Sequence, residues 1–98
     1  MHVLLVRAEL HLPASNSLKV KRSIVTPLIR HLDQMAGVAA AEVDFHDKWQ
    51  RTAVGVTVVG NQVGHVQAVG DTVERYVWSR PDVDVIELET VWWDWNGA

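Results

Sequence analysis

Two short polar segments of this chain carry the residue types that bind anions and nucleic acids. The first begins at Ser17, a residue type that caps helices, and the N–H groups of a helix start attract anions. Three cationic side chains follow within about one turn and would strengthen such a site: Lys19, Lys21 and Arg22. We therefore expect an exposed site for a phosphate or a nucleic-acid backbone. The alternative is a capped helix whose basic side chains are solvated or paired with Asp44 or Asp47.

The second segment, residues 44–51, combines an aromatic ring with charged and hydrogen-bonding side chains. Trp49 could stack on a nucleobase or contact a partner, with His46 and Gln50 supplying hydrogen bonds. Arg51 would join the cations of the first segment if the two segments meet. In the alternative interpretation, Trp49 closes the end of the core and Arg51 lies on the face of its ring.

Signals for catalysis or metal binding are weak in this sequence. It contains no Gly-x-Ser-x-Gly motif, no phosphate-binding loop and no cysteine nucleophile. The five histidines lack the paired spacings that zinc sites favour, and Asp44, His46 and Asp47 offer only a loose oxygen–nitrogen site. We therefore predict a protein that is not an enzyme, with no catalytic residue, no metal site and no cofactor.

The composition predicts one domain, residues 1–98, with a modest core, because the chain has 98 residues of which 48% are hydrophobic. No apolar run approaches the length of a membrane span, no secretory leader is recognisable, and the lack of cysteine fits a cytoplasmic protein. The net charge of -3 disfavours nonspecific nucleic-acid binding. Residues 1–30 nevertheless carry a net positive charge and residues 71–98 a net negative one, so any basic patch comes from the first third.

Hydrophobic periodicity predicts the order strand, helix, strand, strand, helix, strand. Pro27 falls inside the first helical pattern and predicts either a kink or a break at which Thr26 caps a second piece. Asn61 is the expected cap of the second helix, and Gly37 the expected stop of the first. The core faces of the second and last strands are expected to hold Ala39, Ala41, Val43 and Phe45, and Ile86 and Leu88. The six expected ranges are 2–12, 17–36, 38–45, 52–59, 61–80 and 82–93.

This element order predicts an α+β fold of the ferredoxin-like type. Each expected helix has one apolar stripe, so both helices should cover the same face of a four-stranded antiparallel sheet. Right-handed crossovers favour the strand order 4-1-3-2. In that order the end of the first strand lies beside the start of the third. The two polar segments should therefore meet at one end of the sheet.

Three separated motifs add a family resemblance to this interpretation. In chain order they are Ser17-Leu18-Lys19-x-Lys21-Arg22, Glu42-Val43-Asp44 and Asp47-x-Trp49-Gln50-Arg51, followed by a valine-rich strand that contains Gly55. Over residues 1–90 the chain resembles the YlxP-like family of small bacterial proteins, a family without a known activity. The resemblance implies a ferredoxin-like fold in a bacterial cytoplasmic protein. Family genes often lie near those of translation-initiation and ribosome-binding factors, which implies a role in translation or ribosome assembly. Two features depart from the family pattern: Pro27 and the tail after Val91.

The sheet face away from the helices is expected to be open. RNA-recognition modules stack bases on aromatic residues of the two central strands, but the corresponding positions here hold none. The tail, residues 91–98, should extend or cover the last strand, with Trp93 and Trp95 on the open face. We expect a second copy of the chain to cover these rings, and the alternative is a tail that folds back over its own sheet. Candidate self-association residues are Arg7, paired with Glu87 or Glu89, and Thr57, Trp93 and Trp95.

Two functional hypotheses remain from the sequence. In the first, the protein is an accessory factor in translation or ribosome assembly that contacts RNA or a ribonucleoprotein. Its candidate contacts are Ser17, Lys19, Lys21, Arg22, His46, Trp49, Gln50 and Arg51. In the second, it is a self-associating, ACT-like domain that binds a small anionic ligand at the same basic end. Neither hypothesis involves a membrane.

Overall fold

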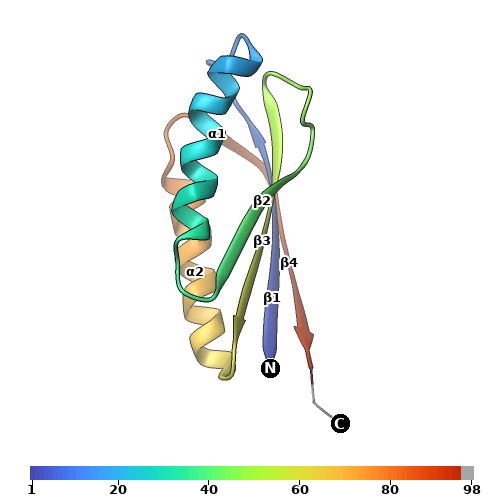
Figure 1. Ribbon diagram of the computed structural model, residues 1–98, viewed down its shortest axis with the longest axis vertical. Helices are drawn as coiled ribbons and strands as arrows, with labels where there is room; N and C mark the ends of the chain where they lie inside the picture. The colour runs from blue at the N-terminus through green and yellow to red at the C-terminus, as the bar shows by residue number, and fades with distance from the viewer. Residues whose placement is uncertain (96–98) are drawn as a thin grey trace.

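Two helices lie against one face of a four-stranded sheet in a computed structural model that describes residues 1–95 (Figure 1). The strand order is β2-β3-β1-β4, and all three neighbouring pairs are antiparallel. The predicted α+β ferredoxin-like arrangement is therefore confirmed, because 4-1-3-2 is the same order counted from the other edge. The elements are β1 (His2–His11), α1 (Leu18–Asp33), β2 (Val38–Asp44), β3 (Arg51–Gly60), α2 (Val63–Ser79) and β4 (Asp84–Asp94).

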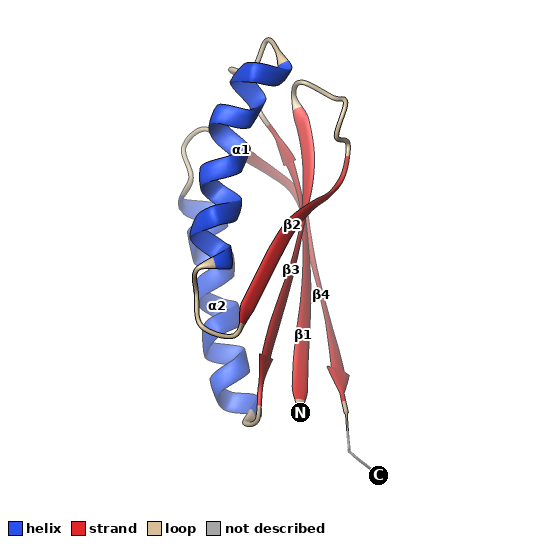
Figure 2. Cartoon of the chain, viewed as in Figure 1, coloured by secondary structure: helices blue, strands red, loops and turns tan. Residues whose placement is uncertain are grey.

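Both helices lie on the same side of the sheet (Figure 2), and the core side chains pack between these two layers. Alternate residues of β1 and β3 point into it, and each helix contributes one buried stripe. Burial of each large apolar side chain contributes about 1.5–3 kcal/mol relative to exposure. The stripes consist of Val25, Leu28 and Leu32 in α1, and of Val66, Val73 and Val77 in α2.

Helix α1 begins as the sequence predicts. The sequence offers Ser17 or Asn16 as the cap, and the structure selects Ser17, whose hydroxyl accepts a hydrogen bond from the backbone N–H of Val20 over 3.1 Å. Helix α2 begins instead at Gln62, whose side chain makes no capping bond, so the predicted Asn61 cap is wrong. Helix α1 also ends earlier than predicted, at Asp33. The backbone N–H of Met35 donates a hydrogen bond to the Leu32 carbonyl. This bond closes a turn that ends the helix before Gly37.

Pro27 lies inside α1, which is unbroken from Leu18 to Asp33. A second helical piece capped by Thr26 is therefore absent from the described residues. Proline has no backbone N–H, so it cannot donate the helical hydrogen bond that the Ser23 carbonyl would accept. Pro27 is exposed, so its ring faces away from the core.

At the sheet edges, the face assignment of β2 is wrong, and that of β4 is confirmed for Leu88, which packs against the core, but wrong for Ile86. In β2, the partly buried side chains are Val38, Ala40 and Glu42, whereas Ala39, Ala41 and Val43 lie on the open face. Phe45 lies beyond the strand, with φ 62 in the left-handed region. In β4, a bulge makes Glu9 pair with Glu87 and Leu10 with Val85, so Ile86 is the extra residue and is exposed.

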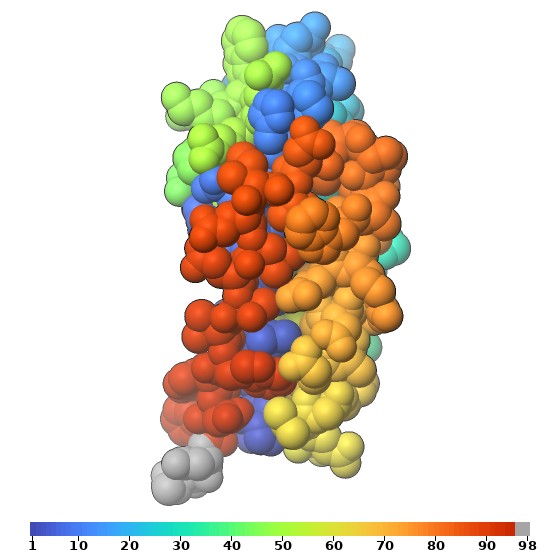
Figure 3. Space-filling view, turned by 180° about the vertical axis from the view of Figure 1, so that it is seen from behind, coloured from blue at the N-terminus to red at the C-terminus, as the bar shows by residue number. Residues whose placement is uncertain are grey.

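The last strand runs along the sheet edge to Asp94, next to β1. The view in Figure 3 shows β4 beside α2 over much of the length of the molecule, which measures 49 Å. Among residues 1–95, no helix combines the length and the apolar character needed to cross a bilayer.

Candidate functional site

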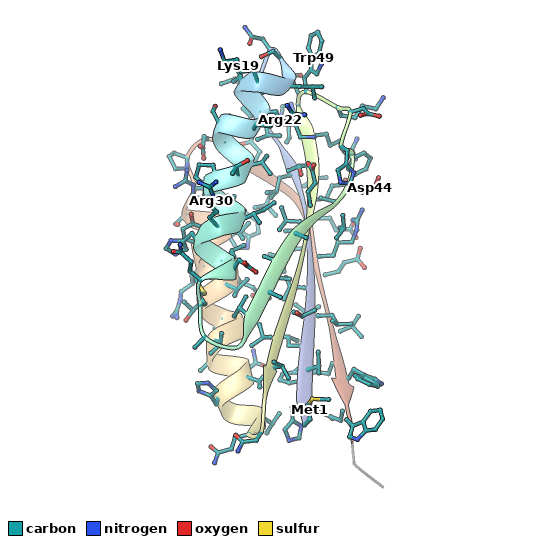
Figure 4. All side chains as sticks on the ribbon, in the orientation of Figure 1. Met1, Lys19, Arg22, Arg30, Asp44 and Trp49 are labelled. Carbon is teal, nitrogen blue, oxygen red and sulfur yellow. The ribbon has the colours of Figure 1, made fainter. Side chains whose placement is uncertain are left out.

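The β1–α1 turn and the β2–β3 hairpin meet at one end of the molecule, as the strand order predicts (Figure 4). The backbone N–H of Leu12 donates to the Gln50 carbonyl over 2.9 Å. The Gln50 side chain donates to the Ser15 carbonyl over 3.0 Å, so this predicted ligand residue holds the two segments together. We call this region, residues 13–22 and 45–51, the hairpin end.

Lys21 is buried at the hairpin end, although the sequence predicts an exposed anion ligand there. Its side chain is 3% exposed. The Nζ atom donates to the carbonyls of Phe45 over 2.6 Å and His46 over 3.2 Å, and it lies 3.0 Å from a Glu42 carboxylate oxygen. The Thr52 hydroxyl donates to the same carboxylate. Because an ammonium group has three donors, Lys21 has none left for an external anion.

Besides Arg51, which binds Glu9, three other cations at this end are exposed: Lys19, Arg22 and Lys48. None of them forms an ion pair with a carboxylate within the part of the chain that the structure describes. Lys19 and Arg22 lie on the first turns of α1, and Lys48 lies in the hairpin. These three side chains, rather than Lys21, supply the positive charge that a ligand could meet.

Trp49 stands at the tip of the hairpin and is 55% exposed, so it does not close the core (Figure 4). Arg51 does not lie on its ring. The Arg51 guanidinium instead lies 4.8 Å from the centre of the Phe45 ring and donates to a Glu9 carboxylate oxygen over 2.6 Å. Glu9 is largely buried, which makes this charge-assisted bond a fixed feature of the site.

A groove of about 490 Å³ runs beside Trp49. Its wall combines aromatic rings with charged and amide side chains, which is the composition that binds planar, partly charged ligands. The groove is lined by His11, Phe45, Asp47, Lys48, Trp49, Gln50 and Arg51.

Sequence reasoning missed four of these lining residues as ligand-binding residues: His11, Phe45, Asp47 and Lys48. Phe45 faces the groove because the chain turns sharply there, with the Asp44 carboxylate accepting from the Phe45 N–H over 2.8 Å. Simple alternation placed that ring in the core, so no sequence signal pointed to it. Lys48 precedes Trp49, and that adjacency alone could have identified it.

His46 is exposed and lies 3.8 Å from Glu42 through its Nε2 atom. Asp44 approaches Arg7 instead of His46 or Asp47. Among the described residues, no group of three histidine, aspartate or glutamate side chains is arranged to hold a metal ion.

The charged half of the open face lies next to the hairpin end. Arg7 lies 3.6 Å from both Glu9 and Asp44, and makes none of the predicted ion pairs with Glu87 or Glu89. Hydrogen bonding to the Glu89 side chain and the charge of Glu89 raise the pKa of Glu87, and the positive charge of Arg7 acts weakly in the opposite sense. Within this half, Glu87 and Glu89 therefore form an acidic surface on β4.

The opposite end of the open face carries the two predicted tryptophans. Trp93 and Trp95 pack edge to face, with ring centres 5.8 Å apart. The Trp95 N–H donates to the Met1 carbonyl over 2.9 Å, so the chain continues straight along β1. Up to Trp95, the tail therefore extends the last strand and does not fold back over its own sheet. Its last positions, 96–98, lie outside the described residues.

Comparison with known proteins returns sequences without an assigned activity. The profile of a family described as "Protein of unknown function (DUF503)" matches residues 3–90. A similar curated protein, "Uncharacterized protein YlxP" of Bacillus subtilis (strain 168), is 24% identical over 78 residues, which cover 80% of this chain and 85% of the relative. Both matches agree with the resemblance that the motifs carry.

Proposed function

The chain belongs to the DUF503 family of proteins of unknown function, and on that premise we propose that it is a non-catalytic RNA-binding protein. The hairpin end is the proposed contact surface for RNA, free or within a ribonucleoprotein. The proposal includes the cytoplasmic role in translation or ribosome assembly that the motif resemblance implies. The proposed function involves neither a membrane nor a metal ion.

The observation that carries the proposal is the exposed Trp49 ring at the same end of the molecule as three exposed cations that have no carboxylate partner among the described residues. An exposed indole can stack on any nucleobase, and such stacking contributes about 1–3 kcal/mol per base. Lys48 precedes Trp49 in the chain. Lys19 and Arg22 lie in the first turns of α1, directly after the β1–α1 turn. Their position at the same end of the molecule as this ring suits a phosphate backbone that passes over the hairpin end.

The structure of the groove supports a single-stranded ligand over a duplex. A base that stacks on Trp49 must be unpaired, and the groove beside it offers the Phe45 ring and the Arg51 guanidinium. Arg51 is held by Glu9, so it presents a fixed edge rather than a flexible charge. The residues that remain available to RNA are Lys19, Arg22, His46, Lys48, Trp49 and Arg51.

The decisive measurement is fluorescence anisotropy of a labelled single-stranded RNA of about 12 nucleotides, a length within the range of known single-strand sites. Trp49→Ala should weaken binding about 5- to 150-fold, the equivalent of one lost stack. Trp78→Ala is the matched control, because Trp78 is 63% exposed but lies on α2 and does not line the groove beside Trp49. Equal affinities for the two variants would refute the proposed site.

A charge pair of variants tests the phosphate contacts separately. Lys19→Ala combined with Arg22→Ala should flatten the dependence of log Kd on log salt by about 1.4, since each single-strand phosphate contact contributes about 0.7. Arg30→Ala combined with Arg75→Ala removes the same charge elsewhere and should leave that slope unchanged. Lys21 is left intact in both variants because it is buried.

A small anionic ligand is the second candidate, in a self-associating domain of the ACT-like type. The specific observation in its favour is the groove volume of about 490 Å³, within the range of small-molecule sites. One small ligand would show a shallow salt slope and would not require Lys19 and Arg22 together. The same salt titration therefore separates the two candidates.

A further inference from the structure

The open sheet face is apolar over the half that lies far from the hairpin end. Two rows of paired residues cross it without a charge. One row consists of Ala39, Thr57, Leu5 and Val91, and the next of Val59, Val3 and Trp93. On the other side of the Leu5 row, Arg7 is the strand neighbour of Glu89 and Gly55, and the charged half begins at this row.

The open face exposes a large apolar patch. Trp93 and Trp95 are 51% and 53% exposed. Since an aromatic side chain offers about 150–250 Å², these two rings alone expose on the order of 200 Å². Leu5, Val43, Val59 and Val91 lie on the same face and are each at least 40% exposed. The total lies within the range of about 300–600 Å² that is typical of the largest patch on a soluble monomer, and such patches are often functional.

The open face is also shaped to fit itself. Large side chains follow β4 and form a ridge, made of Val91, Trp93 and Trp95. Small side chains on the opposite edge of the same face line a hollow of about 370 Å³. A Cβ atom on Gly55 would lie 2.7 Å from Val43 Cγ1, so glycine at this position keeps room for Val43. The side chains that give the hollow its surface on the open face are Leu5, Ala39, Ala41, Val43, Gly55 and Thr57.

We infer that a second copy of this chain covers the open face, with the ridge of each copy seated in the hollow of the other. A two-fold axis in the plane between the sheets exchanges ridge and hollow, as an isologous interface requires. One face holds both complementary shapes, and its apolar half has no charge that would select a different partner. The axis passes near Leu5, which pairs with Thr57 on the hollow side and with Val91 on the ridge side.

The acidic surface on β4 limits how far the contact extends toward the hairpin end. Glu87 and Glu89 already repel each other on one chain, so burying further carboxylates against them would be unfavourable. The hairpin end lies beyond this acidic surface and stays accessible in the dimer. The inference does not depend on RNA binding, and either can fail without the other.

Sedimentation velocity of the full chain tests the dimer directly. The wild-type protein should sediment as a dimer at micromolar concentrations. Val91→Glu places a charge on the ridge, and Ala41→Glu places one in the hollow, so each should weaken the dimer at least 100-fold. Trp78→Glu is the matched control on the outer face of α2 and should remain dimeric. Circular dichroism checks that both variants stay folded, as expected because positions 41 and 91 are exposed.

The results that would overturn the inference are equally specific. A wild-type chain that stays monomeric at high concentration excludes the dimer. A dimer that survives both Val91→Glu and Ala41→Glu must use the β4 edge or the helices instead, and the ridge-and-hollow contact would be wrong. Loss of the dimer in Trp78→Glu alone would move the interface to α2.

Chemical cross-linking tests the position of the axis. The native chain has no cysteine, so a single introduced thiol is the only reactive one. Leu5→Cys should be joined to its copy by a bis-maleimide whose reach matches the ~10 Å between stacked sheets. Arg75→Cys, on the outer face of α2, should not be joined. Cross-linking at position 75 but not at position 5 would contradict the proposed axis.

Discussion

At the scale of single residues, Lys21 shows how burial changes the role of a charged side chain. It lies one turn after the Ser17 cap, on the side of α1 that faces β2, and it bonds two carbonyls and the Glu42 carboxylate. Its neighbours Lys19 and Arg22 point to solvent. Lys21 therefore fixes the hairpin that presents Trp49, and acts on any ligand only through that hairpin.

Lys21→Ala should lower the free energy of unfolding by about 2–3 kcal/mol, because the Glu42 carboxylate and two carbonyls lose their donor. Lys19→Ala, the matched control, should change it by less than about 0.5 kcal/mol, as is usual for an exposed position. Urea denaturation at a fixed protein concentration measures both changes. If the two midpoints shift equally, the Lys21 bonds contribute nothing to stability and the assigned role is wrong.

At the scale of elements, α2 shows how closely a helix approaches the sheet. It contains two glycines in different surroundings, Gly64 and Gly70. A Cβ atom at Gly70 would overlap the Cδ2 atom of Leu4, which is buried in β1, whereas a Cβ atom at Gly64 would meet nothing within 4 Å. Glycine costs helix stability in both places, but only at Gly70 does the contact with β1 require it.

Gly64→Ala should therefore raise the free energy of unfolding by up to about 1 kcal/mol, the difference in helix propensity. Gly70→Ala should lower it by about 1–3 kcal/mol, because overpacking against Leu4 outweighs that gain. The same denaturation experiment compares the two variants with the wild type. A stabilised Gly70→Ala variant would show that α2 can move away from β1 without loss.

At the scale of the whole molecule, the two unusual surfaces lie at opposite ends of a body 49 Å long. Trp49 and the free cations occupy the hairpin end, and Met1 and the β4 tryptophans occupy the other (Figure 4). The acidic part of β4 separates them. This separation lets a dimer form at one end while two hairpin ends remain available.

If the dimer forms, thermal stability should depend on protein concentration, because association removes folded monomer from the unfolding equilibrium. We expect the Tm of the wild type to rise by roughly 3–5 °C for each tenfold increase in concentration. The Tm of Val91→Glu should be independent of concentration over the same range. A constant Tm for both proteins would argue against self-association at those concentrations.

The sequence by itself determined the element order, the strand order and the meeting of the two polar segments. These features follow from periodicity, from the Ser17 cap and from the handedness of crossovers, all of which act over short stretches of chain. The family resemblance could also be read from motifs alone. For the same reason, the position of Trp93 and Trp95 on the open face was predictable, since alternation along β4 continues from Val91.

Only the tertiary structure decided which side chains of the polar segments are free. In β2, apolar residues occupy both alternations, so the sequence could not settle which face is inward. The contact of Glu42 with Lys21 decides it, and this contact joins residues from different elements. The bulge at Ile86 and the turn at Phe45 likewise depend on neighbouring strands. Ion pairs and strand register between distant segments therefore determine which of these side chains are buried. The local sequence pattern could not determine this, because the burial of a side chain depends on the elements that pack against it.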